Sequence, residues 1–226
     1  MKKDYCEIVL VLDRSWSMES IKKDVIGGFN KFLTEQKAVP GEATITLAQF
    51  DHLYEIVYEG KKLQDAPLMD DTIYQPRGWT ALLDAIGRTI DITGKRLSDM
   101  PEDQRPEKVL FVIQTDGYEN ASHKFSNDNI MNMLIHQKDV YKWEFVFLGA
   151  NQDAIATASK MGIGASHSMT YVASAGGVNA SYNSLSSNIA NFRTGTSDTV
   201  AFTETDRKNQ PIVKELEMYQ WMNEGV

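Results

Sequence analysis

Residues 8–17 of this chain read Ile-Val-Leu-Val-Leu-Asp-Arg-Ser-Trp-Ser, an apolar run that ends in one carboxylate and two hydroxyls. A continuous apolar run of this length is typical of a strand buried on both faces of a parallel sheet. The strand is therefore followed directly by three oxygen-bearing side chains close together in the sequence, Asp13, Ser15 and Ser17. Oxygen ligands of this kind suit a small hard cation such as Mg²⁺ or Mn²⁺, whereas zinc sites favour His and thiolate.

Strand-type and helix-type patterns alternate along most of the chain. Strands are expected at residues 5–12, 44–50, 53–58, 109–113, 144–148 and 166–170, and helices at 19–37, 80–98, 126–139, 151–161 and 176–192. Asp51 and His52 alone separate the second and third strands, so these two strands must form an antiparallel hairpin, because a parallel crossover needs about a dozen residues. The whole pattern predicts an α/β fold with a Rossmann-like, doubly wound, mostly parallel central sheet and one antiparallel edge strand.

The chain has 226 residues and a formal net charge of −8. We expect one domain over residues 1–194 and a polar C-terminal tail over 195–226, with a short helix at 212–222 as one option for part of that tail. The negative charge argues against a nucleic-acid partner. The single cysteine, Cys6, excludes an intrachain disulfide and is expected to be a buried apolar residue. The sequence has neither a signal-peptide pattern nor a run of about 20 apolar residues, so a cytoplasmic location without membrane contact is expected.

A second apolar run, residues 109–113, leads to Asp116. Ligands of doubly wound sheets bind outside the carboxyl ends of the strands. If the two strands are neighbours, Asp13 and Asp116 face one crevice, and Thr80, which opens a predicted helix, can lie on its rim. Each feature alone has an ordinary explanation, because Ser, Thr and Asp after a strand often cap helices or form turns. Ser17 and Thr80 could both be such caps, but the combination of all three segments favours a metal site.

The three segments resemble the metal-ion-dependent adhesion site of the von Willebrand factor type A (VWA) family. That site has the sequence Asp-x-Ser-x-Ser in a first loop, a Thr in a second loop and an Asp in a third. The matching stretches are residues 13–17 (Asp-Arg-Ser-Trp-Ser), 78–80 (Gly-Trp-Thr) and 115–117 (Thr-Asp-Gly). The resemblance covers residues 4–193 and is greatest to compact stand-alone VWA proteins of bacteria and phages, including proteins associated with tellurium resistance.

The resemblance implies both a metal site and a mode of binding. Ser15 and Ser17 would coordinate a divalent cation through their hydroxyls. Asp13 and Asp116 would supply negative charge, at least partly through bridging waters, and Thr80 would join or leave the inner shell. The expected ion is Mg²⁺ or Mn²⁺, with Ca²⁺ less favoured. In the family the sixth ligand is usually a Glu or Asp of a partner protein, so the resemblance implies a cation-dependent protein-binding module, acting as a scaffold or assembly factor rather than as an enzyme.

Three aromatic residues lie beside the predicted ligands in the sequence. Trp16 stands where the family often has Gly, Trp79 comes directly before the predicted Thr ligand, and Tyr118 follows the third loop's Asp. We hypothesise that Trp16, Trp79 and Tyr118 form an aromatic rim that contacts the partner around its acidic residue, because such residues are enriched at binding hot spots. The alternative is that both indoles pack against loops of the same chain.

Two other functions stay open from the sequence. A Mg²⁺-dependent phosphoryl-transfer enzyme would also place an Asp after the first strand, but the second Asp that it needs two positions later is Ser15 here, and the Gly-x-x-x-x-Gly-Lys pattern of nucleotide-binding enzymes is absent. No catalytic residue is therefore expected. The chain could also be a structural subunit with a non-functional metal site.

Overall fold

The central sheet of the computed structural model has the strand order β3-β2-β1-β4-β5-β6. The model describes residues 1–150 and 153–211. The strands are β1 (Lys2–Asp13), β2 (Glu42–Phe50), β3 (Tyr54–Lys62), β4 (Pro106–Thr115), β5 (Glu144–Ala150) and β6 (Ser168–Tyr171). β3 pairs antiparallel with β2 at one edge, and the other neighbouring pairs are parallel. The predicted Rossmann-like sheet with one antiparallel edge strand is confirmed.

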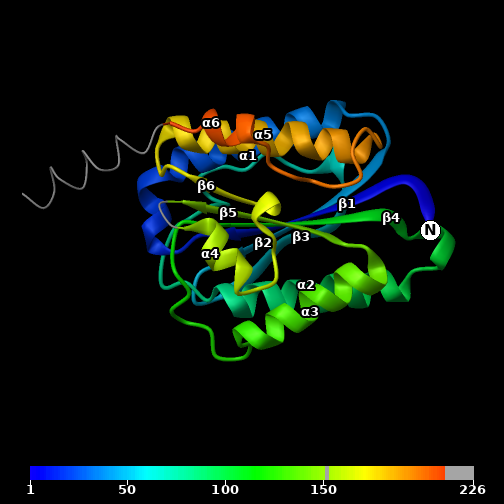
Figure 1. Ribbon diagram of the computed structural model, residues 1–226, viewed down its shortest axis with the longest axis horizontal. Coiled ribbons are helices and arrows are strands. Elements are labelled where there is room, and N and C mark those ends of the chain that lie inside the picture. Colours follow the sequence, from blue (N-terminus) through cyan, green and yellow to red (C-terminus); the bar gives the residue numbers. More distant parts are fainter. Residues whose placement is uncertain (151–152, 212–226) are drawn as a thin grey trace, which may run out of the picture.

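Helices cover both faces of this sheet (Figure 1). One face carries α1 (Lys22–Ala38), α5 (Ala175–Arg193) and α6 (Glu204–Lys208), and the other carries α2 (Leu82–Asp99), α3 (Asn127–Tyr141) and α4 (Ala154–Ser159). Short 3₁₀ turns are η1 (Trp16–Ile21), η2 (Leu63–Asp65), η3 (Glu102–Gln104) and η4 (Ala165–His167). All the strands except the edge strand β3 point their carboxyl ends toward the same side of the molecule, on the left in Figure 1.

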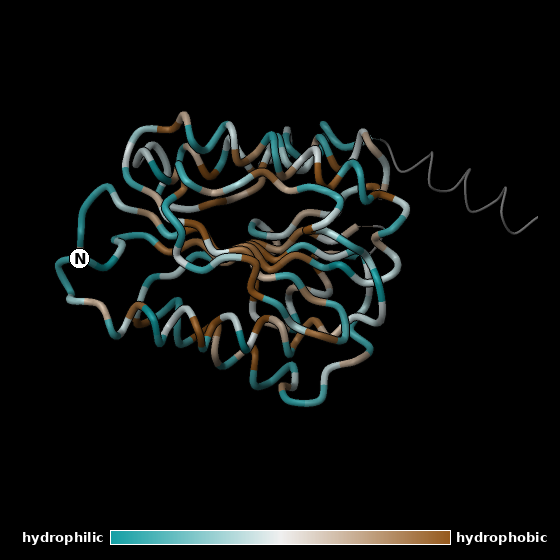
Figure 2. The backbone as a smooth tube through the Cα atoms, turned by 180° about the vertical axis from the view of Figure 1, so that it is seen from behind, coloured by the Kyte–Doolittle hydropathy of each residue, from teal (hydrophilic) through white to brown (hydrophobic). Residues whose placement is uncertain are grey.

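The apolar run in β1 lies at the centre because its side chains alternate between two cores. Ile8, Leu10 and Leu12 pack under α1 and α5, whereas Val9 and Val11 pack under α2. All five are at most 3% exposed. Burying such a side chain contributes about 1.5–3 kcal/mol, so the run stabilises both layers at once. Figure 2 shows the hydrophobic strands gathered between the two helical layers.

Three helices begin two or three residues later than the sequence pattern predicts, among them α4, which is expected from 151 and begins at Ala154. The helix expected at 19–37 is preceded by the turn η1 and begins at Lys22, and the helix expected from Thr80 begins at Leu82. The late start of α2 has a clear cause. The backbone N–H of Thr80 donates to Asn120 Oδ1 at 2.9 Å, and its carbonyl accepts from the N–H of Asn120 at 3.0 Å. These bonds to the loop after β4 hold Thr80 outside the helix.

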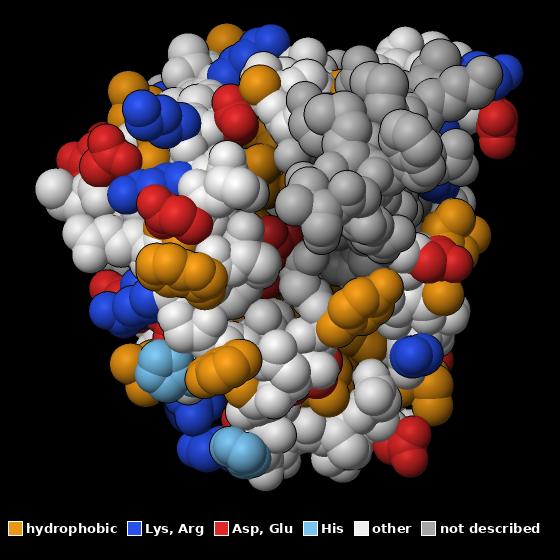
Figure 3. Space-filling view, turned by 90° about the vertical axis from the view of Figure 1, so that its left-hand side faces the viewer, with side chains coloured by type: hydrophobic (Ala, Val, Ile, Leu, Met, Phe, Trp, Pro, Cys, Tyr) orange, Lys and Arg blue, Asp and Glu red, His pale blue; other side chains and the backbone are white. Residues whose placement is uncertain are grey.

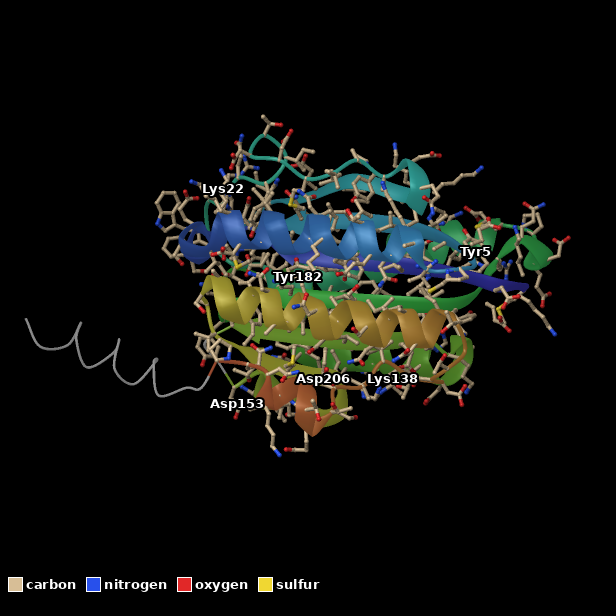
Figure 4. The ribbon with its side chains drawn as sticks, turned by 90° about the horizontal axis from the view of Figure 1, so that it is seen from above. Tyr5, Lys22, Lys138, Asp153, Tyr182 and Asp206 are labelled. Carbon is tan, nitrogen blue, oxygen red and sulfur yellow. The ribbon has the colours of Figure 1, made fainter. Side chains whose placement is uncertain are left out.

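The last helix of the main domain is fixed against α1 near the carboxyl edge of the sheet. Tyr182 of α5, labelled in Figure 4, lies between the two helices. A Cβ added to Gly28 of α1 would lie 2.3 Å from the Tyr182 ring, so this contact requires glycine. The Tyr182 hydroxyl donates to Gln114 Oε1 at 2.6 Å, which connects α5 to β4 directly before the predicted site.

The chain after residue 194 continues to pack on the domain. Val200 and Phe202 are buried in the core beneath α5, and Thr203 caps α6. The helix considered at 212–222 lies outside the described residues, and the domain boundary at 194 stays a prediction. Among residues 1–150 and 153–211, none of the helices has the length and apolarity that crossing a bilayer requires.

Candidate metal centre

Asp13 is the last residue of β1, and its carboxylate is completely buried. One oxygen, Oδ1, accepts the backbone N–H of Ser15 at 2.6 Å, and the other, Oδ2, accepts the hydroxyl of Thr115 at 2.5 Å. Thr115 is the last residue of β4, which pairs with β1. The parallel pairing thus places the ends of the two predicted ligand loops side by side.

The two serines of the first loop connect Asp13 to the third loop. Ser15 Oγ lies 3.1 Å from Ser17 Oγ, and the Ser17 hydroxyl donates to Asp116 Oδ1 at 2.5 Å. Ser15 is buried, whereas Ser17 is exposed and Asp116 half-buried. The oxygens therefore extend from the interior to the surface, as a site open on one side requires.

Thr80 reaches the same place from the second loop. A Cβ built on Gly117 would lie 2.9 Å from Thr80 Oγ1 and 3.5 Å from Ser17 Oγ. Gly117 therefore permits hydroxyls from two loops to approach the backbone beside Asp116. All the predicted metal residues, Asp13, Ser15, Ser17, Thr80 and Asp116, come together at the carboxyl edge of the sheet.

The capping explanation for the hydroxyls does not hold in the structure. The residues at the N-cap positions of η1, α1 and α2 are Ser15, Ile21 and Ala81, and none of them makes a side-chain capping bond. Ser17 directs its hydroxyl to Asp116, away from the helix that follows it. Thr80 precedes the N-cap of α2. The hydroxyls are thus available to ligands other than the helix backbones.

The buried charge of Asp13 lacks a cationic partner among the described residues. The fold provides such partners elsewhere: Asp51 pairs with Arg14 Nε at 3.0 Å and Arg77 Nε at 2.9 Å. Burial raises the pKa of Asp13 to about 7, against the lowering effect of its hydrogen bonds with Thr115 and Ser15. Burial also raises the pKa of Asp116. A buried carboxylate of this kind becomes stable in its charged form when a cation binds beside it.

The donor set decides which cations fit. It contains two carboxylates and three hydroxyls, and among the described residues no three His, Cys, Asp or Glu side chains cluster as a metal site. Hydroxyl and carboxylate oxygens fit Mg²⁺ or Mn²⁺, and the absence of imidazole and thiolate from the set makes it a poor zinc site.

Several residues that position the loops were not predicted from the sequence. Asp51 follows β2 and is completely buried, and its two arginine partners belong to the first and second loops. The backbone N–H of Arg77 also donates to the carbonyl of Arg14 at 2.7 Å. The Tyr74 hydroxyl donates to the carbonyl oxygen of Asp13 at 2.7 Å. Asp51 comes directly after a strand at the same edge of the sheet, and this signal could have identified it.

The loop after β4 fastens itself to the start of α2. Glu119 Oε2 accepts the N–H of Leu83 at 2.9 Å, and its other oxygen accepts the N–H of Ser122 at 2.7 Å. Asp84, in the first turn of α2, accepts backbone N–H groups of Lys124 at 2.8 Å and Phe125 at 3.0 Å. Burial tends to raise the pKa of Asp84, but these backbone bonds outweigh it and lower the pKa. The second and third loops therefore form one hydrogen-bonded unit.

The three aromatic residues beside the site are exposed. Trp16 is 68% exposed, Trp79 69% and Tyr118 66%, so neither indole packs into its own chain. Figure 3 looks onto this end of the molecule and shows hydrophobic side chains at its surface. We call Trp16, Trp79 and Tyr118 the aromatic rim.

The single cysteine, Cys6, is buried in β1, far from these loops. Burial raises the pKa of its thiol to about 12.

Comparison with known proteins identifies the fold. No protein-family model matches the chain, and no curated protein matches it. The pilus adhesin SpaC from Lactobacillus rhamnosus GG aligns with a TM-score of 0.61 and 17% identity, over 84% of this chain and 31% of SpaC. The vWF domain of the type V pili tip protein Mfa5 from Porphyromonas gingivalis aligns with a TM-score of 0.56 and 11% identity, over 88% of this chain and 97% of that domain.

A third similar structure is proximal thread matrix protein 1 from the mussel byssus, with a zinc-occupied metal-ion-dependent adhesion site. Its TM-score is 0.56 at 12% identity, over 79% of this chain and 46% of that protein. This chain thus spans less than half the length of SpaC and of the mussel protein. Sequence identities this low carry information about the fold alone. The chain has the fold of von Willebrand factor type A domains.

Proposed function

We propose that this protein is a divalent-cation-dependent protein-binding module. One Mg²⁺ or Mn²⁺ ion would be held by five side chains: Asp13, Ser15, Ser17, Thr80 and Asp116. A Glu or Asp of a partner protein would take the remaining ligand position of the ion. The protein would act as a scaffold or assembly factor and not as an enzyme. The cytoplasmic location stays a prediction from the sequence.

The observation that carries the proposal is the position of Asp13. Its carboxylate is buried among neutral hydrogen-bond donors, while the hydroxyls of Ser17 and Thr80 approach the backbone of Gly117 beside Asp116. Uncompensated burial of a carboxylate costs several kcal/mol, so such a group needs a cation or a proton. A divalent cation balances Asp13 and Asp116 together.

The chemistry of the hydroxyls supports a carboxylate partner. Ser and Thr hydroxyls are neutral ligands, so the ion would remain strongly attractive to an anionic oxygen. Mg²⁺ keeps an octahedral shell and gives up its waters reluctantly, so a single open position for a partner carboxylate suits this ion. The same fold holds a metal ion in the mussel protein and belongs to an adhesin in SpaC, which supports the proposal of metal-dependent adhesion at the level of the fold.

The metal site is tested by titrating Mg²⁺ and Mn²⁺ into the wild type and Asp116→Asn by calorimetry. Asp128→Asn, an exposed change in the first turn of α3, is the matched control. The wild type and the control should bind one ion, and Asp116→Asn should bind at least about tenfold more weakly. Equal binding by all three proteins would remove Asp116 from the site.

The partner is tested by affinity capture from native lysate. Wild type and Asp13→Ala are compared in Mg²⁺ and in chelator, and the proposal expects proteins that are retained by the wild type in Mg²⁺ alone. Phosphatase and ATPase assays run beside it. Robust turnover that Asp13→Ala abolishes would replace the binding role with a catalytic one.

The aromatic rim would contact the partner around its acidic residue. We expect Trp16→Ala and Trp79→Ala to weaken partner binding by about tenfold or more, since exposed tryptophans at a binding centre are frequent hot spots. Mg²⁺ affinity should not change, because neither indole is a ligand. Leu53→Ala, which removes an exposed apolar side chain from the β2–β3 turn, is the control. Unchanged partner affinity in both tryptophan variants would remove the rim from the interface.

A further inference from the structure

The described part of the chain ends at the same edge of the molecule as the candidate metal site. Pro211 lies against Gly176 in the first turn of α5, where an added Cβ would be 3.4 Å from the proline ring. In the amide orientation that satisfies both of its ends, the Gln210 side chain bonds to Gly177 O at 3.3 Å and Ser181 N at 3.2 Å. The start of α5 follows the carboxyl end of β6 at Tyr171.

Strand pairing gives the approximate distance between the carboxyl end of β6 and the metal site beside β1. Tyr171 pairs with Ala150 of β5, and Gly149 of β5 pairs with Thr115 of β4, which donates its hydroxyl to Asp13. Neighbouring strands lie about 4.8 Å apart, so the three steps from β6 to β1 amount to about 15 Å. The carboxyl end of β6 thus lies about 15 Å across the sheet from β1, and the described part of the chain ends beside the first turn of α5, which follows β6.

The residues after Pro211 have the length and the chemistry to reach that site. Residues 212–226 read Ile-Val-Lys-Glu-Leu-Glu-Met-Tyr-Gln-Trp-Met-Asn-Glu-Gly-Val. An extended chain advances about 3.4 Å per residue, so Glu215 and Glu217 can reach about 14 and 20 Å from Pro211. The segment carries three Glu and one Lys, a net charge of −2.

The apolar residues of the segment would also find exposed apolar side chains beside the metal site. Apolar residues stand between and after the first two acidic residues of the segment, at Leu216, Met218, Tyr219 and Trp221. The aromatic rim presents three side chains that are each about two-thirds exposed on the same edge. A carboxylate flanked by apolar side chains could bind the cation and contact the exposed aromatic residues at the same time.

We propose that residues 212–226 dock on the metal site of their own chain, with a carboxylate of the Glu215-Leu216-Glu217 stretch in the position open to a partner. This inference rests on the proposed function and names a regulator of that site. A tethered ligand has an effective concentration in the millimolar range. An outside partner must therefore displace the tail, and its apparent affinity is reduced accordingly.

The test uses the full-length chain and a fluorescent synthetic peptide of residues 212–226 as the probe. In Mg²⁺, the full-length Glu215→Gln/Glu217→Gln variant should bind the peptide at least about tenfold more tightly than the wild type, whose own tail competes. The matched control is the full-length Glu224→Gln variant, which should behave as the wild type. Chelator, or the same two substitutions in the peptide, should abolish binding.

Mg²⁺ calorimetry on the same proteins separates the two proposals. Mg²⁺ binding without any peptide binding would overturn the docking and leave the proposed function standing, whereas a lack of Mg²⁺ binding would overturn both. Peptide binding that persists in chelator would overturn metal-mediated docking. Equal peptide binding by the wild type and the double variant would overturn docking on the same chain, and a molecular mass that rises with concentration would then assign the tail to a second copy.

Discussion

Strand β1 buries two carboxylates completely, one in its middle and one at its carboxyl end, but the fold treats them differently. In the middle of the strand, Glu7 accepts the hydroxyl of Thr46 at 2.7 Å and pairs with Arg96 Nη2 at 2.8 Å. At the carboxyl end, Asp13 accepts bonds from neutral groups alone, within the part of the chain that the structure describes. The protein itself balances the charge of Glu7 with Arg96. It provides no such partner for Asp13 among the described residues, and the proposed cation would supply the missing positive charge.

The strongest test of this comparison is Asp13→Asn, which keeps the shape of the side chain and removes its charge. We expect at least about a hundredfold loss of Mg²⁺ affinity, because a ligand charge disappears from a site with two carboxylates. In chelator the melting temperature should stay the same or rise, since a buried charge has been removed. The measurement is thermal melting with Mg²⁺ and with chelator. A Mg²⁺-dependent shift as large as that of the wild type would break the comparison.

The pH dependence of the metal-free protein should show the uncompensated charge directly. The pKa of Asp13 is raised from 3.8 to about 7 by burial, so the folded state binds this proton more tightly than the unfolded state does. The stability that protonation contributes is fully present below pH 3.8 and is lost as the pH rises through about 7. In chelator we expect the free energy of unfolding to fall by on the order of a few kcal/mol over this range, and Asp13→Asn should remove most of the fall.

Glu7→Gln should lower the stability and leave the Mg²⁺ affinity unchanged, which is the opposite of what Asp13→Asn should do. The substitution leaves Arg96 beside a neutral group, and we expect a loss of about 2 kcal/mol of unfolding free energy, less than for a fully buried pair because Arg96 is partly exposed. The Mg²⁺ affinity of the folded protein should not change. Urea unfolding and calorimetry provide the two measurements, and a change in Mg²⁺ affinity without a change in stability would contradict the assignment of Glu7.

The smallest expected effect concerns the link between the first and second loops. Arg77 contacts Asp51 but its side chain is 49% exposed, so Arg77→Ala should cost at most about 1 kcal/mol of stability. Arg14 retains its own bond to Asp51 and should keep Mg²⁺ affinity within about threefold of the wild type. Raising the salt concentration should have the same small effect as the substitution. A larger change in affinity would show that Arg77 positions the ligands as well as the loop.

The sequence predicted the parts of this molecule that depend on local pattern. The sheet, the edge hairpin and the helices follow from apolar runs and their spacing, and residues 126–139 match α3 closely. Asp13 and Asp116 could be grouped because strand ends meet at one edge of a parallel sheet, and Thr80 joined them because it opens a predicted helix. Their assignment as metal ligands stays a prediction.

The residues that hold the loops in place could not be predicted in the same way. The pairs formed by Asp51 with Arg14 and by Glu119 with Leu83 join positions that are 37 and 36 residues apart. Such pairs depend on how the loops fold over one another, and local periodicity carries no information about this. The late start of α2 has the same origin, because Asn120 competes for the backbone of Thr80.

The two edges of the sheet limit how copies of this protein can associate. β3 presents Glu55, Glu59, Lys61 and Lys62 along its length, and its register with β2 shifts twice. The opposite edge strand, β6, is four residues long. Charged, irregular or short edge strands oppose the addition of further strands. Growth of the sheet from chain to chain is thereby discouraged, so contacts between copies of this protein should be made by side chains and not by pairing of strand backbones.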